Sequence, residues 1–361
     1  MKDSRLTGPI KIVGTGLIGT SIGLALKSKG LDVFLDDSSP AVLDLAIDFG
    51  AGKKYEAGVE PELVIVCTPP DVTALVIAKE LLAHPAATVT DVASVKGTVL
   101  TALQQQGIAL TNYVGSHPMA GREQTGALAG RGDLFIGRPW VITPSKESTN
   151  AAVLKVESLA HDLGATVVSM DPLEHDKAVA LVSHAPQIVS SLLAARLASA
   201  DSADVSLAGQ GLRDTTRIAA SDPKLWMQIL SANSQQVSAV LKQVRNDLDQ
   251  ILEALQDTSK AGSLTSIGKL LESGNQGVSK IPGKHGSSAT QYAKVTVMID
   301  DKPGELARLL TEIGQIGINL EDLTLEHVTG AQVGLPELYV LPSSEAELVS
   351  ALTERGWKIV G

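Results

Sequence analysis

The feature that most constrains this chain is a glycine-rich turn between two short apolar runs near its start. The first run covers residues 10–13, and the turn after it holds three glycines: Gly14, Gly16 and Gly19. The first glycine allows a tight turn, the second lets the backbone approach a pyrophosphate, and the third lets helix and strand pack closely. A second run, 33–35, ends at Asp36, where a carboxylate can bind ribose hydroxyls. We expect a dinucleotide at the start of the helix.

The neighbours of Asp36 favour NAD over NADP. Asp37 follows directly, and two adjacent carboxylates repel a 2′-phosphate. Lys53 and Lys54 could still fold back toward the ribose, so NADP stays open, and Asp37 is equally consistent with a solvated turn residue. The predicted cofactor-binding residues are Gly14, Gly16, Leu17, Ile18, Gly19, Asp36 and Thr68.

The first part of the chain alternates short apolar runs with helical patterns. Strands are expected at 10–13, 32–35, 63–67, 88–91, 112–115, 139–142 and 166–169, with helices such as 18–29, 72–82 and 149–163 between them. Such alternation is typical of a parallel sheet with crossover helices. The sequence therefore predicts an α/β Rossmann-type NAD-binding domain over residues 8–171.

From Pro172 the composition becomes rich in alanine and leucine. It predicts an all-α domain over 172–272, with helices at 173–199, 202–209, 212–220, 222–255 and 258–271. Apolar residues in the long fourth helix recur at steps of three and four. We expect this stripe to bury itself against a second subunit in a homodimer, with packing inside one chain as the alternative.

The last part of the chain predicts a separate small domain. Residues 273–291 are rich in glycine, serine and polar residues and are expected to form a linker. Residues 292–361 then follow a βαββαβ order with strands at 292–299, 320–328, 333–341 and 357–360 and helices at 303–316 and 344–355. That order is ferredoxin-like.

Composition excludes several classes of function. The formal net charge of −10 disfavours nucleic acid and anionic membranes as partners. The single cysteine, Cys67, rules out an internal disulfide and fits a reducing cytoplasm, where we expect this protein. No apolar run reaches membrane-spanning length, and no metal-ligand spacing of cysteine or histidine is found.

Three polar patches could carry chemistry. Residues 91–96 and 116–123 follow predicted strands, and ligands of such sheets bind at the carboxyl ends of the strands. His117 can accept a proton at neutral pH, and Ser94 could hydrogen-bond it or the substrate. The third patch holds Arg213 and Arg217, which could bind carboxylates or pair with nearby aspartates. A second histidine, His184, lies at an expected helix bend, whereas surface or capping positions are expected for His84, His161, His175 and His327.

Together these patches resemble the prephenate dehydrogenase family of tyrosine biosynthesis over essentially the whole chain. The family's Asp-x-x-Ser-x-Lys element corresponds to Asp91, Ser94 and Lys96, and its His-Pro-x-x-Gly-x-Glu element to His117, Pro118, Gly121 and Glu123. Its Arg-Asp-x-Thr-Arg stretch begins at Arg213. The sequence departs from the family at Gln187, where a second histidine is common.

The resemblance implies oxidative decarboxylation of prephenate by NAD to 4-hydroxyphenylpyruvate. It implies His117 as the base, Ser94 as its orienting partner and Arg217 as the partner of the ring carboxylate. The remaining substrate-binding residues implied are Glu123, His184, Gln187, Arg213 and Lys96. The C-terminal unit resembles an ACT domain, which implies a tyrosine or phenylalanine effector near Gly304 and Asn319, with a purely structural module as the alternative.

Other functions stay open on the sequence. Arogenate dehydrogenase shares the ring chemistry but takes an amine in place of the keto group. A hydroxy-acid dehydrogenase or imine reductase would use a lysine or aspartate of the second domain, for which Lys177 and Asp176 are candidates. A non-enzymatic sensor of NAD and amino acids is a third alternative.

Overall fold

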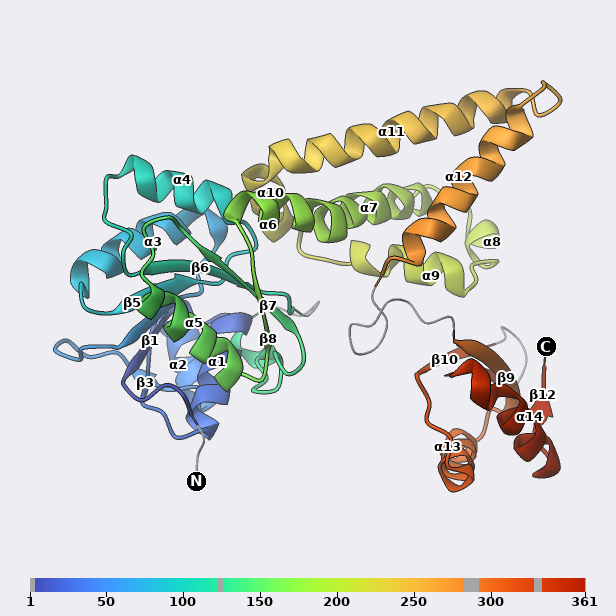
Figure 1. Ribbon diagram of the computed structural model, residues 1–361, viewed down its shortest axis with the longest axis horizontal. Coiled ribbons are helices and arrows are strands. Elements are labelled where there is room, and N and C mark those ends of the chain that lie inside the picture. Colours follow the sequence, from blue (N-terminus) through green and yellow to red (C-terminus); the bar gives the residue numbers. More distant parts are fainter. Residues whose placement is uncertain (1–3, 122–125, 282–291, 328–332, 361) are drawn as a thin grey trace. The chain divides into compact units, whose positions relative to one another are not determined.

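The computed structural model describes residues 4–121, 126–281, 292–327 and 333–360, which divide into two compact units at residues 245 and 246. The first unit contains one eight-stranded sheet (Figure 1). Its strands are β1 (Ile10–Val13), β2 (Val33–Asp36), β3 (Lys53–Lys54), β4 (Leu63–Val66), β5 (Thr88–Asp91), β6 (Tyr113–Pro118), β7 (Pro139–Pro144) and β8 (Thr166–Ser169). The order is β3-β2-β1-β4-β5-β6-β7-β8, and every pair is parallel except β6 with β7. The Rossmann-type fold predicted from the sequence is confirmed.

Helices cover both faces of this sheet. The helices are α1 (Leu17–Ser28), α2 (Pro40–Asp48), α3 (Pro70–Ala83), α4 (Gly97–Gln105), the short η1 (Ala127–Ala129) and α5 (Asn150–Asp162). Buried residues of α1, α2 and α5 pack with Ile10 and Ile12 on one face. Residues of α3 and α4 pack with Val64 and Val66 on the other (Figure 1). The central strands are apolar on both sides because each side faces a helix layer.

The register of the strands sets the position of the site. Val13 pairs with Asp36 and with Val66, Val66 pairs with Asp91, and Asp91 pairs with Gly115. The first four of these residues end their strands, and Gly115 of β6 lies level with them, so all five mark one edge of the sheet. The loops after Val13, Val66 and Asp91, together with the last residues of β6, must meet at that edge.

The helical region differs in detail from the expectation. It comprises α6 (Pro172–Val179), the π-helical turn η2 (Ala180–His184), α7 (Ala185–Leu197), α8 (Ser202–Val205), α9 (Gln210–Thr216), the 3₁₀ turn η3 (Arg217–Ala219), α10 (Pro223–Ala232), α11 (Ser234–Gln256) and α12 (Ser263–Val278). The turn η2 interrupts the expected helix 173–199 just before Pro186, which has no N–H to donate to an α-helical bond. The expected helix 222–255 breaks at Asn233. Helix α12 runs into the expected linker, whose part from residue 282 on lies outside the described residues.

Helices α6 and α7, with η2 between them, form one long apolar rod. By length and composition alone, the segment Pro172–Leu197 would be long enough to cross a membrane, contrary to the expectation that no run reaches that length. Its buried residues nevertheless include His175, Asp176 and His184, which hydrogen-bond within the protein. The exposed apolar residues on this rod are Leu173, Leu181, Val182, Val189, Leu192 and Leu193.

The second unit contains the C-terminal domain with the expected element order. Its elements are β9 (Ala293–Asp300), α13 (Glu305–Ile316), β10 (Asp322–His327), β11 (Val333–Val340), η5 (Pro342–Ser344), α14 (Glu345–Glu354) and β12 (Lys358–Ile359). The antiparallel sheet has the order β10-β11-β9-β12. Side chains of both helices and the sheet, such as Leu309, Leu348 and Val297, form its core. The βαββαβ prediction is confirmed.

Candidate active site

A cleft of ≈ 1010 Å³ lies at the carboxyl edge of the eight-stranded sheet. The glycine-rich turn, the ends of β4, β5 and β6, and helix α10 line it. The lining includes these residues proposed from the sequence: Gly14, Gly16, Leu17, Ile18, Asp36, Thr68, Ser94 and His117. Residues from five separate stretches of sequence thus meet in one place, as the strand register requires.

The glycine-rich turn has the geometry that a dinucleotide needs. Gly14 has φ +96°, and a Cβ on Gly19 would lie 2.0 Å from the carbonyl oxygen of Gly14. A Cβ on Gly16 would meet nothing within 4 Å, and no side chain caps the start of α1 there. Gly19 therefore serves helix–strand packing, whereas Gly16 leaves space where a pyrophosphate can approach the helix start.

The two carboxylates at the end of β2, Asp36 and Asp37, make different contacts. The Asp36 carboxylate lines the cleft and lies 3.6 Å from the buried Lys11 amine. The Asp37 carboxylate accepts hydrogen bonds from the Thr15 N–H at 2.7 Å and the Ser39 N–H at 2.8 Å. Asp37 is therefore bound to the turn rather than solvated. The sequence offered no signal for this beyond its position beside Asp36.

Asp91 and Lys96 form a buried support beneath the cleft. The Lys96 amine donates to the Asp91 carboxylate and, at 2.7 Å, to the Ser116 carbonyl oxygen. Asp91 also accepts from the Tyr113 hydroxyl at 2.8 Å and from the Ala93 N–H at 3.0 Å. Lys96 is 2% exposed and is not part of the cleft lining, so the structure does not support the substrate contact expected from the sequence. The pair instead fixes the loop that carries Ser94.

His117 is the titratable group of the cleft that is best suited to proton transfer. It is the next-to-last residue of β6, is half-buried and lines the cleft. Its Nδ1 lies 2.9 Å from Nε2 of His175. Burial, and then the nearby His175, Lys96 and His184, hold the pKa of His117 well below its usual range. The imidazole is therefore neutral at neutral pH and can act as a proton acceptor.

His175 is the functional residue that the sequence analysis missed. A surface or capping position was expected, but the residue is fully buried in α6. Its Nδ1 lies 2.9 Å from Oδ1 of Asp176, and its ring meets that of His117 edge to face, with centroids 5.1 Å apart. No local pattern marks it, because its partner His117 is 58 residues away in the sequence.

His184 and Gln187 lie on the buried side of the helical rod, outside the lining of the cleft. The Asn233 amide lies 3.1 Å from Nδ1 of His184, and the Gln187 amide donates to the Ser221 hydroxyl at 2.8 Å. Burial lowers the pKa of His184 to about 4, with the Asp176 carboxylate opposing the shift. Their contacts in the described chain are thus with the helical domain itself.

The expected carboxylate-binding arginines are not part of the cleft lining. Arg213 and Arg217 are exposed on α9 and η3. Among the described residues, the lysines that line the cleft are Lys79 and Lys224. Glu123 lies outside the described residues, and Lys177, the candidate of the alternative class, pairs on the surface with Glu174 at 2.7 Å.

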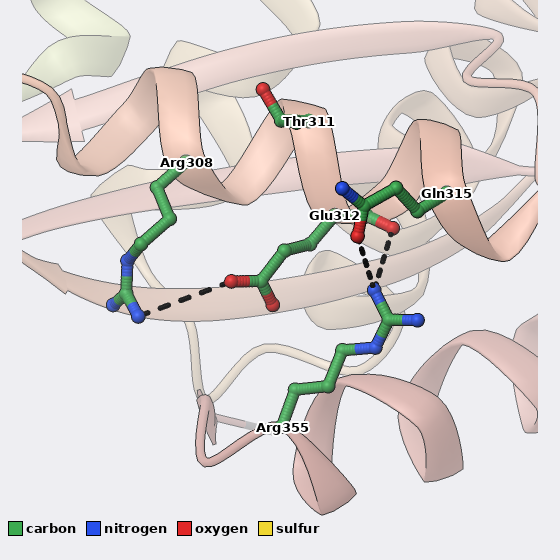
Figure 2. Close-up of a pocket in the computed structure, with 5 residues that line it drawn as sticks. All are labelled: Arg308, Thr311, Glu312, Gln315 and Arg355. Carbon is green, nitrogen blue, oxygen red and sulfur yellow. Dashed lines mark hydrogen bonds and ion pairs between the residues drawn. The ribbon is translucent and has the colours of Figure 1, made fainter.

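A second hollow lies on the C-terminal domain and offers less chemistry (Figure 2). Its polar groups are already paired: the Arg355 guanidinium donates to the Glu312 carbonyl oxygen at 3.1 Å, and Arg308 lies over the Trp357 ring at 4.0 Å. Gly304 and Asn319 flank opposite ends of α13, about 18 Å apart at 1.5 Å of rise per residue. One small effector could not contact both within a single chain.

Comparison with known proteins identifies relatives of both N-terminal domains. Residues 22–169 match the profile described as "Prephenate dehydrogenase, nucleotide-binding domain", and residues 171–268 match "Prephenate dehydrogenase, dimerization domain". The probable prephenate dehydrogenase NovF of Streptomyces niveus is 37% identical over 353 residues, which cover 96% of this chain and 98% of that protein.

Solved structures agree with this result. A prephenate dehydrogenase from Aquifex aeolicus, in complex with hydroxyphenyl propionate and NAD⁺, gives a TM-score of 0.66 at 26% identity and covers 76% of this chain and 99% of that one. The arogenate dehydrogenase of Synechocystis gives a TM-score of 0.62 at 26% identity, with coverage of 75% and 98%.

Proposed function

The chain belongs to the prephenate dehydrogenase family, and we propose that it catalyses the NAD-dependent oxidative decarboxylation of prephenate to 4-hydroxyphenylpyruvate. The observation that carries this proposal is the position of His117 in the same cleft as the glycine-rich turn. Gly14, Gly16, Leu17 and Ile18 would hold the pyrophosphate, and Asp36 the ribose. NAD bound there supplies the hydride acceptor.

The side chains of the cleft account for the proton transfers of this reaction. When the ring carbon loses its hydride, the hydroxyl on that carbon becomes a carbonyl, and neutral His117 takes up the hydroxyl proton. The electrons of the breaking carbon–carboxylate bond then enter the ring, CO₂ leaves, and the resulting phenolate oxygen takes the proton back. Ser94, also in the lining, would orient the hydroxyl. No metal is needed to balance these steps.

The two carboxylates of prephenate need cationic partners. Lys224 lines the cleft and supports one such contact. Arg217 is favoured by the family motif but is exposed outside the lining. We propose Lys224 as a carboxylate partner from this chain and keep Arg217, with Arg213, as the motif-based alternative.

Arogenate is the alternative substrate, favoured by the similarity to the Synechocystis arogenate dehydrogenase. The test is an assay of the purified full-length protein with prephenate and with arogenate, each with NAD and with NADP, by absorbance of the reduced nicotinamide. We expect the highest kcat/KM for prephenate with NAD. Faster turnover of arogenate would reassign the substrate, and absence of turnover with both substrates would contradict the proposal.

A homodimer formed through the helical domain accompanies this function. The profile matched by residues 171–268 is that of a dimerisation domain. Helix α11 exposes four apolar side chains at helical spacing: Val244, Leu248, Leu252 and Leu255. Such a stripe suits burial against a second copy. We also propose that the enzyme works in the cytoplasm, where its single thiol stays reduced.

We further propose that the C-terminal domain is an ACT domain that binds tyrosine or phenylalanine. Since Gly304 and Asn319 flank opposite ends of α13, the effector would lie between two subunits and touch Gly304 of one and Asn319 of the other. Calorimetry of the full-length dimer with each amino acid tests this. Heat of binding that Asn319→Ala removes is expected, whereas no heat with either amino acid would make the domain purely structural.

A further inference from the structure

His117, the proposed base, is the first residue in a series of buried hydrogen bonds. Nδ1 of His117 lies 2.9 Å from Nε2 of His175, and Nδ1 of His175 lies 2.9 Å from Oδ1 of Asp176. His175 and Asp176 are 0% and 4% exposed, and neither lines the cleft. They therefore do not touch substrate or cofactor but contact the residue that would.

The contacts of Asp176, the last residue of this series, determine which atom donates in each hydrogen bond. The carboxylate accepts the Lys96 N–H through Oδ1 and the Gly97 N–H through Oδ2, both at 2.8 Å. These two donors open helix α4, where the positive end of the helix dipole favours a negative charge. A carboxylate has only acceptor atoms, so Asp176 can only accept from the His175 ring.

Because Asp176 accepts, the positions of the ring hydrogens on His175 and His117 are fixed. If Nδ1 of His175 donates to Asp176, then Nε2 of the neutral ring is an acceptor. That acceptor requires a hydrogen on Nδ1 of His117. The remaining ring nitrogen of His117, Nε2, then carries a lone pair and no hydrogen, which is the form that a general base needs.

Charged and titratable groups near His117 also bear on its state. Among the described residues these groups include the Lys96 amine, whose partner is Asp91, and His184. Burial is the largest cause that lowers the pKa of His117, and both groups lower it further, so its ring is neutral before the substrate proton arrives.

We propose that His175 and Asp176 are positioning residues that hold His117 in its Nδ1–H tautomer and present Nε2 to the substrate hydroxyl. This inference rests on the proposed function. During the reaction the substrate proton moves to Nε2, while Nδ1–H stays bonded to His175. The imidazolium so formed faces an acceptor nitrogen backed by a carboxylate, which stabilises its charge. The proton returns to the phenolate from the same Nε2.

The first test reads the hydrogen positions directly. Neutron diffraction from crystals of the full-length enzyme near pH 7.5 shows which ring nitrogens carry hydrogen. We expect hydrogen on Nδ1 of both His117 and His175 and none on Nε2 of His117. Hydrogen on Nε2 of His117 would overturn the proposal. This readout does not depend on turnover, so a wild-type protein that fails to oxidise prephenate would contradict the proposed function alone.

The second test measures the kinetic effect of losing the acceptor. We expect His175→Phe to lower kcat roughly 10²–10³-fold. The KM for prephenate and the affinity for NAD, measured by fluorescence titration, should stay within about twofold, since no contact to either ligand is lost. His175→Gln keeps an amide oxygen that can accept from Nδ1 of His117, and we expect it to recover at least about tenfold of the loss.

A matched control separates this effect from simple damage to the core. His84 is also buried, at 6% exposure, but lies at the end of α3 and is not part of the cleft lining. His84→Phe should keep kcat near the wild-type value. A kcat for His175→Phe within threefold of wild type, or an equal loss in His84→Phe, would overturn the positioning role. If His175→Phe does not fold, the glutamine variant and the neutron data still decide.

Discussion

At the scale of single residues, His117 combines a neutral ring with a fixed position of its hydrogen. Burial disfavours the imidazolium, and the hydrogen bond from Nδ1 to His175 leaves Nε2 as the basic nitrogen. A base with a low pKa is a weak acceptor in water, but here the reaction itself supplies driving force, since it ends in an aromatic ring. Neutrality at all physiological pH values is then the more useful property.

Replacing His117 with asparagine should therefore remove the proton acceptor and little else. We expect His117→Asn to lower kcat by roughly 10²–10⁴-fold while the affinity for NAD, read by fluorescence titration, stays nearly unchanged. Steady-state kinetics with prephenate provide the check. Turnover close to the wild-type value would assign the base to another residue.

The carboxylate partners can be distinguished by charge removal. Lys224→Met should raise the KM for prephenate about tenfold or more, because a charge-assisted hydrogen bond contributes about 1.5–3 kcal/mol. The exposed Lys146, in the loop between β7 and α5, gives the control Lys146→Met with an unchanged KM. An effect of Arg217→Ala that exceeds that of Lys224→Met would favour the arginine named by the family motif.

The buried histidines also predict an acid limit to stability. Folding lowers the pKa of His117, and that of His184 to about 4, whereas an unfolded histidine titrates near about 6.5. Between these values the unfolded chain binds more protons, so the free energy of unfolding falls as the pH falls below about 6.5. Urea denaturation between pH 7.5 and 4.5 should show this loss. In His184→Asn the free energy of unfolding should fall less steeply with falling pH than in the wild type. Stability that rises toward acid pH would be inconsistent with neutral buried rings.

At the scale of elements, one glycine of the glycine-rich turn serves packing and another serves cofactor binding. Gly19 has a backbone oxygen where its Cβ would be, whereas the space beside Gly16 is open. The same substitution at the two sites should therefore act on different properties. Asp37 also stabilises the turn, since its carboxylate accepts a hydrogen bond from the N–H of Thr15.

Alanine substitutions test this division. Gly19→Ala should lower the melting temperature, because its Cβ would lie 2.0 Å from a carbonyl oxygen. Gly16→Ala should leave the melting temperature within about a degree of wild type but weaken NAD binding, by about 1–3 kcal/mol if a pyrophosphate contact is lost. Differential scanning fluorimetry with and without NAD measures both. Equal thermal effects of the two variants would contradict the assignment.

At the scale of the whole molecule, the exposed apolar stripe of α11 calls for a covering surface. Leu248 and Leu252 are 53% and 50% exposed in the chain alone. Such exposure on a well-formed helix is costly in water, at about 25 cal/mol per Å². A second copy of the helical domain would cover it, in line with the dimerisation profile.

A single charge in the stripe should disrupt this association. We expect the wild type to elute as a dimer of its 37.5 kDa chain and Leu252→Glu to shift toward the monomer in light-scattering chromatography. Gln250→Glu adds the same charge to α11 without removing an apolar group and should remain dimeric. A Leu252→Glu variant that stays fully dimeric would place the interface elsewhere.

The sequence alone determined the elements of this protein, because their signals are local. Hydrophobic periodicity and the glycine spacing located the dinucleotide turn, the longer strands and the ferredoxin-like unit within a few residues. The short strand β3 was not expected, and α12 begins at Ser263 rather than at the predicted residue 258. Interruptions such as η2 and Asn233 were missed, since they depend on one proline and one side-chain bond within an otherwise helical pattern. Motifs likewise pointed to His117 and Ser94, which both line the cleft, because these residues lie at or just after the carboxyl ends of strands that share one edge.

Only the tertiary structure decided which polar groups meet. The bonds from His117 to His175 and from Asp176 to the start of α4 join residues separated by 58 and about 80 positions, and no periodic pattern records such contacts. The same holds for Lys96, which the motif suggested for substrate and the fold uses to bind Asp91 in the interior. A side chain's role follows from its partners and its burial, and both arise only when distant segments pack together.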